Sequence, residues 1–558
     1  MLKENVEGFM KRIIAAISAV LVVVGIFFGF RVADKPAAGK DKTTVTSQEL
    51  KPFSKYKKTV TYTIGKSTPG IPKLPKGQTY ENNAYTKYLK KTLNIQSKDK
   101  FEAETGDAYD RKVSMAVASG DLPDIMSVNI DTLRTLVASG EIQDLSKVYK
   151  SSTSKFVKEK YNSYNGRALK EATFNGKLMA IPSTQNATAP TMLWIRQDWL
   201  DKLGLKAPKT VAELQKVLTA FVEKDPGNNG KGKTIGLALS KSVGGMYGSL
   251  FVADNIFATY NSYPRQWIRQ NGKVVYGSTT NQTKQALGLL ASWYKKGLID
   301  PQMAVRDSIE SLIISGKAGA FFGPWWSGDY PLNSAKQKDP KADWKPYMIS
   351  KNGDGKISAY TQDPDSEFYV VKKGYAHPEL LPKLVSALND RLVRKDKNYK
   401  PVVDFVQNGY DGGKPLDVMV NFNNATVQMY KDLQATVDGK KNPSSLSLDD
   451  STSYKNIKDY LKDPKNANAN AWSGYTSRML GAKLMATTKV KSVNPVYFGQ
   501  TKSMKLKWTN LGTLEDETFL KIVTGEESIN KFSKFVHQWN QQGGAQITKE
   551  VSTAVGKK

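Results

Sequence analysis

Residues 193–204 read Leu-Trp-Ile-Arg-Gln-Asp-Trp-Leu-Asp-Lys-Leu-Gly. They begin with an apolar run typical of a strand, and a helical pattern follows directly. A second helix follows, because Thr210-Val-Ala-Glu213 has the pattern of a capping box. Apolar residues then recur along one face of that helix, at Val211, Leu214, Val217, Leu218 and Phe221. A strand followed by amphipathic helices is the pattern of α/β proteins, so this stretch predicts the fold class.

The same alternation extends outward through the chain from Val60. Thr59 to Ile64 alternates as a strand, and residues 82–93 carry apolar side chains at helical spacing. Asp307-Ser-Ile-Glu310 predicts another helix start, and a helix near the C-terminus is expected to end at Gly543-Gly544. No repeat occurs at the periods of solenoids or propellers. We therefore predict an α/β chain. Its length of 558 residues is too great for one small domain and predicts two large lobes.

The rare residues exclude several kinds of chemistry. The chain has no cysteine, which excludes disulfides, thiolate metal sites and a cysteine nucleophile. His377 and His537 are its two histidines, too few for a multi-histidine metal site, and they argue against a Ser-His-Asp triad.

The chain is strongly basic, with 82 Lys and Arg against 52 Asp and Glu and a formal net charge of +30. Such a surplus favours contact with anionic surfaces, among them nucleic acid, anionic lipid and cell-wall polymers. The lysines are spread along the whole chain, however, and do not form the basic blocks of nucleic-acid modules. We therefore predict no nucleic-acid partner.

The N-terminus carries a targeting segment. Residues 13–30 form an uncharged run of 18, preceded by Lys11 and Arg12, which favours export of everything that follows. No cysteine follows to carry a lipid, and the small-residue cleavage sites ending at Ala33 or Ala38 are poor. We favour an uncleaved anchor over a cleaved signal peptide.

The predicted organisation of the N-terminus follows from that run. We assign residues 1–33 to the signal anchor or signal peptide and residues 34–58 to a polar, lysine-rich tether, with the folded body beginning near Thr59. The predicted location is the extracellular face of the cell membrane, where the protein is anchored or from which it is secreted.

Several stretches carry a recognisable pattern in a fixed order. They are residues 118–125 (Ala-Ser-Gly-Asp-Leu-Pro-Asp-Ile), 175–182 (Asn-Gly-Lys-Leu-Met-Ala-Ile-Pro), 294–301, 316–326, 519–525 and 539–544. Together with residues 193–204 and the helix start at Pro208, they resemble the extracellular solute-binding proteins of bacterial ABC importers. The likeness is to the large oligosaccharide-type family, which includes Gram-positive lipoproteins and alginate-binding proteins.

The resemblance implies a two-lobed, type II periplasmic-binding-protein-like fold, with a ligand cleft between the lobes and an N-terminal hydrophobic helix. We place the first lobe at residues 59–190 and about 357–400, and the second, more helical lobe at about 191–356 and 401–558. The resemblance also implies an oligosaccharide ligand, permease subunits as partners, a monomer, and no chemistry on the ligand.

Two aromatic pairs are the predicted stacking platforms for a sugar ring. Sugars present flat apolar faces ringed by hydroxyl groups, so their sites combine aromatic rings with polar side chains. Trp325 and Trp326 are adjacent and precede Asp329 in what reads as a loop after a strand. Trp472 and Tyr475 form a second such pair. One ring of each pair can equally belong to the core.

The predicted polar contacts lie in loops. Arg196 follows a strand and precedes a helix, which is where α/β folds place ligands. Gln185 and Asn186 follow an Ile-Pro stretch, and Asp124 follows Pro123. For each of these residues a capping or loop role explains the pattern equally well. Trp199, by its spacing from Leu200 and Leu203, is predicted to be a core residue.

Acidic residues crowd residues 361–371, where Glu367 is a further predicted ligand contact. Asp363 and Asp365 precede it and suggest the paired carboxylates of a glycoside hydrolase. Pro364 interrupts the strand that would align these side chains, so we predict a solvated turn that leads into a strand over residues 368–371.

Residues 225–234 correspond to a calcium loop found in alginate-binding relatives. Asp225, Asn229 and Gly230 match positions one, five and six of an EF-hand loop. Positions three, nine and twelve lack ligands, being Gly227, Lys233 and Gly236. A plain turn is favoured, calcium at Asp225 and Asn229 remains the alternative, and no other cofactor is expected.

Two other functions remain open. A permanent anchor would also suit a binding protein that reports to a sensor kinase, and a surface enzyme that degrades glycans is the less favoured alternative. No phosphate-binding loop, metal cluster or nucleophile–base pair stands out in the sequence, so we predict that the chain is not an enzyme.

Overall fold

The computed structural model describes residues 46–68, 74–185, 190–363, 365–408 and 410–556. From Thr46 onward these residues form one compact unit. The predicted anchor and residues 34–45 of the tether lie outside the described residues. Within the described ranges, none of the helices has the length and apolar character that a membrane span requires.

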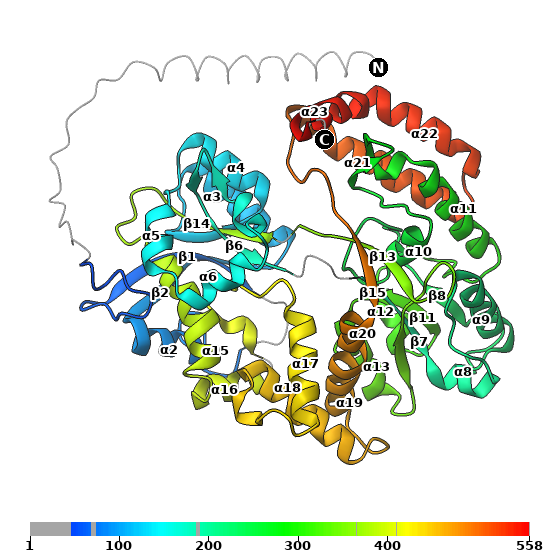
Figure 1. Cartoon of the computed structure of the whole chain (residues 1–558), viewed down its shortest axis with the longest axis horizontal. Helices are drawn as coiled ribbons and strands as arrows, with labels where there is room; N and C mark the ends of the chain where they lie inside the picture. Colours follow the sequence, from blue (N-terminus) through cyan, green and yellow to red (C-terminus); the bar gives the residue numbers. More distant parts are fainter. Residues whose placement is uncertain (1–45, 69–73, 186–189, 364, 409, 557–558) are drawn as a thin grey trace, which may run out of the picture. The chain divides into compact units, whose positions relative to one another are not determined.

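A five-stranded sheet organises the N-terminal half of the described chain (Figure 1). Its strands, in spatial order, are β2 (Ile95–Glu104), β1 (Val60–Thr68), β3 (Ile125–Val128), β14 (Asp365–Val371) and β6 (Ile181–Thr184). β1 pairs in parallel with β2 and β3, whereas β14 runs antiparallel to β3 and β6. β14 therefore returns to this sheet from far along the sequence.

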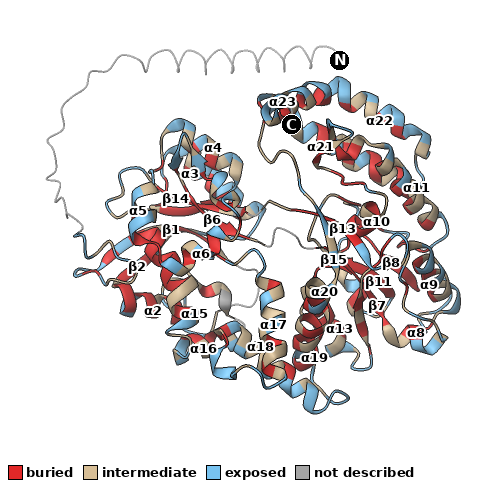
Figure 2. Cartoon of the chain, in the orientation of Figure 1, coloured by how far each residue is buried: buried red, intermediate tan, exposed pale blue. Residues whose placement is uncertain are grey.

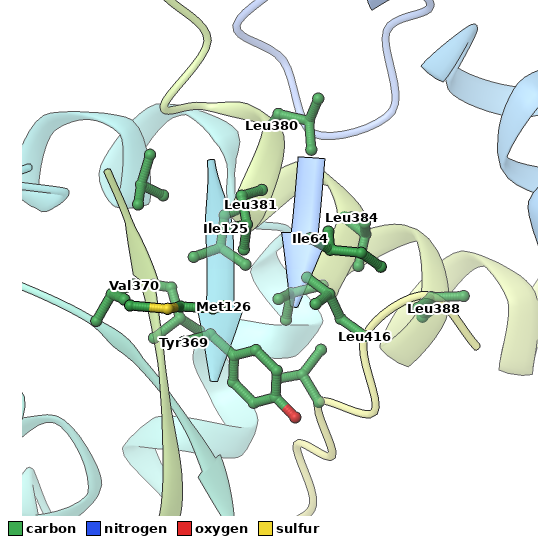
Figure 3. Packing of buried hydrophobic residues seen from close by; sticks show 14 of the residues in the cluster. Ile64, Ile125, Met126, Tyr369, Val370, Leu380, Leu381, Leu384, Leu388 and Leu416 are labelled. Atoms are coloured by element: carbon green, nitrogen blue, oxygen red, sulfur yellow. The ribbon is translucent and has the colours of Figure 1, made fainter. Parts of the chain in front are cut away.

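Helices complete the core around this sheet. They are α2 (Ala84–Leu93), α3 (Asp107–Ser119), α4 (Ile130–Ser139), α5 (Ser146–Ser152), α6 (Lys155–Asn162), α7 (Arg167–Lys170), α14 (Leu380–Ser386), α15 (Leu392–Arg394) and α16 (Lys400–Gln407). Figure 3 shows leucines of α14 packed over Ile64 and Ile125 of the central strands. We call this sheet and its core the first lobe.

A four-stranded sheet organises the second lobe. Its strands, in spatial order, are β12 (Trp344–Tyr347), β7 (Met192–Arg196), β11 (Ala318–Gly323) and β8 (Ile235–Ala238). β11 pairs in parallel with β8 and antiparallel with β7. Every residue of β7, β8 and β11 is buried, which explains why these strands read as continuous apolar runs (Figure 2).

Helices cover the second sheet and extend to the C-terminus. They are α8 (Gln197–Leu203), α9 (Val211–Lys224), α10 (Asp254–Thr259), α11 (Asn281–Lys295), α12 (Glu310–Ile314), α13 (Leu332–Lys338), α21 (Lys502–Thr524), α22 (Phe532–Trp539) and α23 (Ala545–Val555). At the predicted stop, Gly543 has a φ of 131° and the chain continues into α23. The glycines therefore kink the C-terminal helix without ending it.

The strand–helix stretch at residues 193–224 folds as its sequence predicts. Trp199 is buried and meets the ring of Phe221 edge-on at 5.2 Å between ring centroids. The Thr210 hydroxyl accepts a hydrogen bond from the Glu213 amide at 3.1 Å. The Glu213 carboxylate accepts from the Lys209 amide at 2.7 Å, one residue before the position that a capping box uses.

Smaller strands and helices complete the described fold. The strands are β13 (Lys356–Tyr360), which pairs in parallel with β15 (Lys489–Val493), and the hairpins β4 (Thr173–Phe174) with β5 (Lys177–Leu178) and β9 (Trp267–Gln270) with β10 (Lys273–Tyr276). The helices are α17 (Ala425–Val437), α18 (Leu448–Lys462), α19 (Ala469–Tyr475), a π-helical turn over Thr476–Gly481, and α20 (Ala482–Thr487). β13 leads directly into β14, so the chain crosses between the sheets there.

The first core extends beyond the boundary predicted near residue 400. It includes Val402, Phe405, Leu416, Val418, Val420 and Leu448. Beyond residue 400, the described chain leaves this core at α17 and α18, whose residues Leu433 and Ile457 belong to a separate small core. α17 contacts α20. The rest of the predicted division of the sequence into lobes stays a prediction.

The end of the predicted tether is attached to the first lobe. We call residues 49–56 the N-terminal strap. Ser152 donates a hydrogen bond to the Leu50 carbonyl at 2.6 Å, and the Lys383 ammonium donates to the Glu49 carbonyl at 2.5 Å. Tyr56 is buried, and its hydroxyl donates to Glu379 at 2.8 Å. The folded body therefore begins about ten residues earlier than Thr59.

Candidate ligand groove

A groove of about 770 Å³ is lined by residues of both lobes and of the connecting helices. Its lining combines aromatic and polar side chains. The lining includes Phe156, Lys160, Thr184, Gln185, Tyr247, Gly248, Ser249, Pro324, Trp325, Trp326, Gln362, Arg394, Met419, Asn421, Phe422, Gln428, Asp432, Ser447, Asp449 and Asp450.

Trp325 and Trp326 form one wall of the groove on a short turn after β11. Both side chains are half-buried, and Trp325 also packs against the core around Trp194 and Trp472, whereas Trp326 does not. The Pro324 carbonyl fixes the turn, because it accepts hydrogen bonds from the Trp194 indole at 3.0 Å and from the Ser327 hydroxyl at 2.8 Å. The turn is therefore anchored to β7 through a buried tryptophan.

The turn that bears the two tryptophans also packs closely against the π-helical turn over Thr476–Gly481. A Cβ atom at Gly481 would lie 2.3 Å from the Trp325 carbonyl oxygen, so only glycine allows this approach. Asp329 accepts hydrogen bonds from Ser473 and Arg478, and the Arg478 guanidinium lies 5.7 Å from the Trp325 ring centroid. Asp329 is therefore a positioning residue for Arg478.

The opposite wall contains a second aromatic group, which comes from α6 and the segment before α17. Phe156 and Phe422 meet edge-on at 5.6 Å. The Arg394 guanidinium lies 4.2 Å from the Phe156 ring centroid and pairs with Asp390 at 3.2 Å. This wall presents apolar rings beside charged groups that already have partners.

Acidic side chains at the start of α18 complete the lining. The Ser447 hydroxyl accepts from the Asp450 amide at 3.1 Å and donates to the Asp450 carboxylate at 2.8 Å. Burial raises the pKa of Asp450. Burial lowers the pKa of Lys160, which also lines the groove, to about 8, and its ammonium donates to the Asn389 carbonyl at 2.9 Å. The groove thus offers both acceptors and donors to a polar ligand.

Gln185 and Gln362 lie where the chain crosses between the sheets. The Gln185 amide donates to the Asp363 carbonyl at 2.8 Å, and the Tyr164 hydroxyl donates to the Gln185 carbonyl at 3.1 Å. Gln362 packs against Gly248, where a Cβ atom would meet its amide nitrogen at 2.8 Å. These contacts place two amide side chains in the groove lining.

The loop bearing Tyr247 and Gly248 is held by a buried carboxylate. Asp254, at the start of α10, accepts a hydrogen bond from the Gly245 amide at 2.6 Å, and its other oxygen has no partner among the described residues. Burial raises the pKa of Asp254 to about 7, although Arg265 opposes this shift. Asp254 is therefore protonated in the folded protein at pH values where an exposed aspartate is charged.

We expect the Asp254→Asn substitution to flatten the pH dependence of stability. The folded state holds this proton up to a pKa of about 7 whereas the unfolded chain loses it near 3.8, so stability falls as pH rises between these values. The loss is about 1.4 kcal/mol for each pH unit inside that window. Urea unfolding of both proteins across the window measures the difference. The other buried carboxyls contribute equally to both proteins. If the free energy of unfolding changed with pH in the same way in both, Asp254 would not have this role.

Arg196 and Asp124 have structural partners and do not line the groove. Arg196 is buried, with ion pairs to Asp198 at 2.6 Å and to Asp339 at 3.7 Å, and it lies 4.8 Å from the Trp199 ring centroid. Asp124 accepts hydrogen bonds from the amide and hydroxyl of Thr63 at 2.8 and 2.9 Å. The capping and packing roles therefore account for both residues.

The second predicted platform is also part of the packing. Trp472 is buried in a core of the second lobe, and the Tyr475 ring stacks on Tyr460 at 4.3 Å. Glu367 lines a different, smaller cavity of about 90 Å³ beside Lys66 and accepts from the Tyr369 hydroxyl at 3.1 Å. Burial raises the pKa of Glu367. Asn186 lies outside the described residues.

Of the carboxylates before Glu367, Asp365 is buried and Asp363 is half-buried, which corrects the solvated turn expected from the sequence. β14 begins at Asp365, and Asp365 is 7% exposed. Burial raises the pKa of Asp363 to about 6 and that of Asp365, with Asp363 adding to the shift, to about 9. β14 therefore begins three residues before the strand that was predicted over residues 368–371. Neither carboxylate lines the groove.

The loop over residues 225–234 is held together by protein groups. The Asp225 carboxylate accepts from the amides of Asn229 at 2.9 Å and Gly230 at 2.8 Å, and also from the Thr234 hydroxyl. The Lys202 ammonium donates to the Pro226 carbonyl at 2.8 Å. Within the described ranges no group of three or more His, Cys, Asp or Glu side chains is placed to hold a metal. These residues do not fit calcium.

We expect calcium and chelators to leave the stability of this protein unchanged. A metal that binds only the folded state raises the melting temperature by mass action. Here the Asp225 oxygens already have protein donors, and a lysine ammonium lies beside the loop. Differential scanning fluorimetry with excess calcium and with EDTA measures the effect. A calcium-dependent rise that Asp225→Asn abolishes would contradict this expectation.

Part of the groove lining was not predicted from the sequence. Phe156, Phe422 and the aspartates at the start of α18 come from segments that are distant from Trp325 in sequence. Phe156 follows the helix cap at Ser154, and Asp449 and Asp450 follow the cap at Ser447, so each reads as an ordinary first-turn residue. Only the fold brings them together.

Residues 83–380 match the family model described as bacterial extracellular solute-binding protein. The match covers more than half of the chain. It begins at the cap of α2 and ends at the first residue of α14, so it includes the whole second sheet, every strand of the first sheet except β1, and the Trp325–Trp326 turn.

Two curated proteins are similar in sequence. The polygalacturonan/rhamnogalacturonan-binding protein YtcQ of Bacillus subtilis is 25% identical over 458 residues, which is 79% of this chain and 82% of the relative. The fructooligosaccharide ABC transporter substrate-binding protein FusA of Streptococcus pneumoniae is 29% identical over 233 residues, which is 38% of this chain and 42% of the relative.

Solved structures share the fold. The alginate-binding protein AlgQ2, solved without calcium, superposes with a TM-score of 0.58 at 17% identity and covers 90% of this chain and 98% of its own. An HMO-binding, ABC-transporter-associated solute-binding protein of Bifidobacterium longum infantis gives a TM-score of 0.59 at 15% identity, with 89% and 98% covered. The predicted α/β, two-lobed fold is confirmed.

Proposed function

Because this chain belongs to the family of bacterial extracellular solute-binding proteins, we propose that it captures an oligosaccharide in the groove and delivers it to an ABC importer. The observation that carries the proposal is the pair of half-buried tryptophans on the groove wall. Adjacent rings that face a polar groove match the flat apolar face of a sugar.

The remaining lining supports the same ligand class. Sugar hydroxyls both donate and accept hydrogen bonds, and the groove offers amides from Gln185 and Gln362 together with the carboxylates of α18. Phe156 and Phe422 supply apolar surface on the opposite wall. Enclosure of a ligand between aromatic rings and polar side chains is the usual arrangement of a small-molecule site.

The names of the relatives support a glycan and an importer. YtcQ is named for binding polygalacturonan and rhamnogalacturonan, and FusA is named as the substrate-binding protein of a fructooligosaccharide ABC transporter. By analogy, the partners of this chain are the permease subunits of an importer, to which it passes its ligand chemically unchanged. We propose that it acts as a monomer.

The proposed location follows from the family and the N-terminus. The family is extracellular, and a relative of 24% identity in Bacillus subtilis is named a lipoprotein. This chain has no cysteine to carry a lipid, so we propose that residues 13–30 hold it at the outer face of the membrane by peptide instead. N-terminal sequencing of the mature protein tests this: a start near Asp34 or Gly39 would mean cleavage.

A thermal-shift screen of glycans tests the binding function. Oligogalacturonides, fructo-oligosaccharides, alginate oligosaccharides and human milk oligosaccharides are each added in excess, and a ligand of the folded state raises the melting temperature. Mass spectrometry of the glycan after incubation should find it intact. Failure of every glycan to stabilise the protein would refute the proposed ligand class, and cleavage products would indicate an enzyme.

A further inference from the structure

A second cavity, also of about 770 Å³, shares part of its wall with the groove. The shared residues are Phe156, Val393, Arg394, Asp432, Ser447 and Asp450. Because so many side chains face both spaces, the two cavities are neighbouring compartments that meet at the Phe156–Arg394 contact. We call the second compartment the side arm.

The N-terminal strap supplies an aromatic ring to the side arm. Phe53 lines this compartment and is half-buried. Hydrogen bonds hold the strap on both sides of it, through the Leu50 carbonyl and the Tyr56 hydroxyl. Tyr56 belongs to the first core, whereas Phe53 is absent from that core and from the described apolar side chains that pack against it. Core packing therefore does not account for Phe53.

The chemistry of the side arm resembles that of the groove. Phe53 and Phe156 provide apolar rings, and Ser445 and Ser447 provide hydroxyl groups. Its arginines are paired, Arg391 with Asp396 at 2.8 Å and Arg394 with Asp390 at 3.2 Å. Of its two lysines, Lys397 donates to the Leu446 carbonyl at 2.8 Å and Lys395 is exposed. Rings beside hydroxyls and neutralised charges suit an uncharged, hydroxyl-rich ligand better than an ion.

We infer that the side arm is a distal subsite for a long oligosaccharide, in which Phe53 stacks on a sugar unit remote from the Trp325–Trp326 platform. This inference rests on the proposed function and adds a preference for chain length. A short glycan fills only the groove. A longer one passes the Phe156–Arg394 contact and gains the stacking surface of the strap.

Isothermal titration of a length series tests the inference. The series is the di-, tetra- and octasaccharide of the glycan that stabilises the protein most in the thermal-shift screen. Phe53→Ala is expected to weaken binding of the octasaccharide about five- to twentyfold and to leave the disaccharide unchanged. Phe53→Tyr keeps a ring and should restore most of the affinity. Lys55→Ala, an exposed change in the same strap, is the matched control.

The outcomes separate the inference from the proposed function. Phe156 faces both compartments, so Phe156→Ala should weaken short and long glycans alike. Equal affinities of Phe53→Ala and the unchanged protein for the octasaccharide would overturn the side arm while leaving sugar capture intact. Equal losses for disaccharide and octasaccharide would also overturn it, as a general effect on the fold. Binding of no glycan by the unchanged protein would refute both.

Discussion

Replacing Trp325 or Trp326 by alanine is expected to weaken oligosaccharide binding about 5- to 150-fold for each ring, with little effect on stability at Trp326. The expected loss is about 1 to 3 kcal/mol, the contribution of a stacked aromatic ring together with its apolar contact area. Both side chains are half-buried and lie on a turn whose hydrogen bonds from Ser327 and Trp194 to the Pro324 carbonyl do not involve either ring, so truncation leaves those bonds in place. Trp325 also packs against the core, so we expect its truncation to cost more stability than that of Trp326. Isothermal titration and urea unfolding of each variant measure the two effects.

Two controls give this result its meaning. Phenylalanine at either position keeps a flat ring, so Trp325→Phe and Trp326→Phe should retain much of the affinity. Leu506 is an apolar side chain on α21 that is 78% exposed and lies outside the groove lining, so Leu506→Ala should change neither property. If the alanine variants unfold at lower urea without a selective loss of affinity, the tryptophans are packing residues.

Replacing Gly481 by alanine is expected to lower both stability and affinity. Gly481 has helical backbone angles, where alanine is normally favoured over glycine by roughly 0.5 to 1 kcal/mol. A Cβ atom at this position lies 2.3 Å from the Trp325 carbonyl oxygen, however, and backbone cannot rotate away. We expect a net loss of about 1 to 3 kcal/mol in stability, and displacement of the Trp325 turn that weakens binding about tenfold.

Gly512 is the matched control for Gly481. It lies within α21, and a Cβ atom there would meet nothing within 4 Å. Gly512→Ala should therefore leave affinity unchanged and keep or raise stability by less than about 1 kcal/mol. A Gly481→Ala protein as stable as Gly512→Ala, with the ligand affinity of the unchanged protein, would mean that the turn is not held by this contact. Urea unfolding and titration with the same oligosaccharide decide it.

Local patterns predicted much of the fold because the information they need is local. The strand at β7, the cap at Thr210 and the buried face of α9 follow from spacings of a few residues. The position of β14 does not follow from local spacing, because all four strands of the second sheet lie between β6 and β14 in the sequence. Periodicity also says nothing about which core a helix joins, which is why residues up to Leu448 extend the first core past the predicted boundary.

The site was predictable where a residue type was unusual for its surroundings. Two adjacent tryptophans after a buried strand are hard to bury together, and both face the groove. Arg196 had an equally suggestive place at a strand end, but its charge is neutralised by Asp198, two residues away, and by Asp339, which only the fold brings near. Phe156 and Phe422 gave no signal, because a phenylalanine near a helix end is ordinary in sequence.

The strap determines how mechanical load enters the molecule. Its described contacts, through Leu50, Tyr56 and the Lys383 ammonium, are made with the first lobe. A pull transmitted from the residues before it therefore acts on that lobe, and the second sheet is loaded only through the crossing segments. If the protein is held by its N-terminus as proposed, the first lobe is therefore the part that bears the load directly.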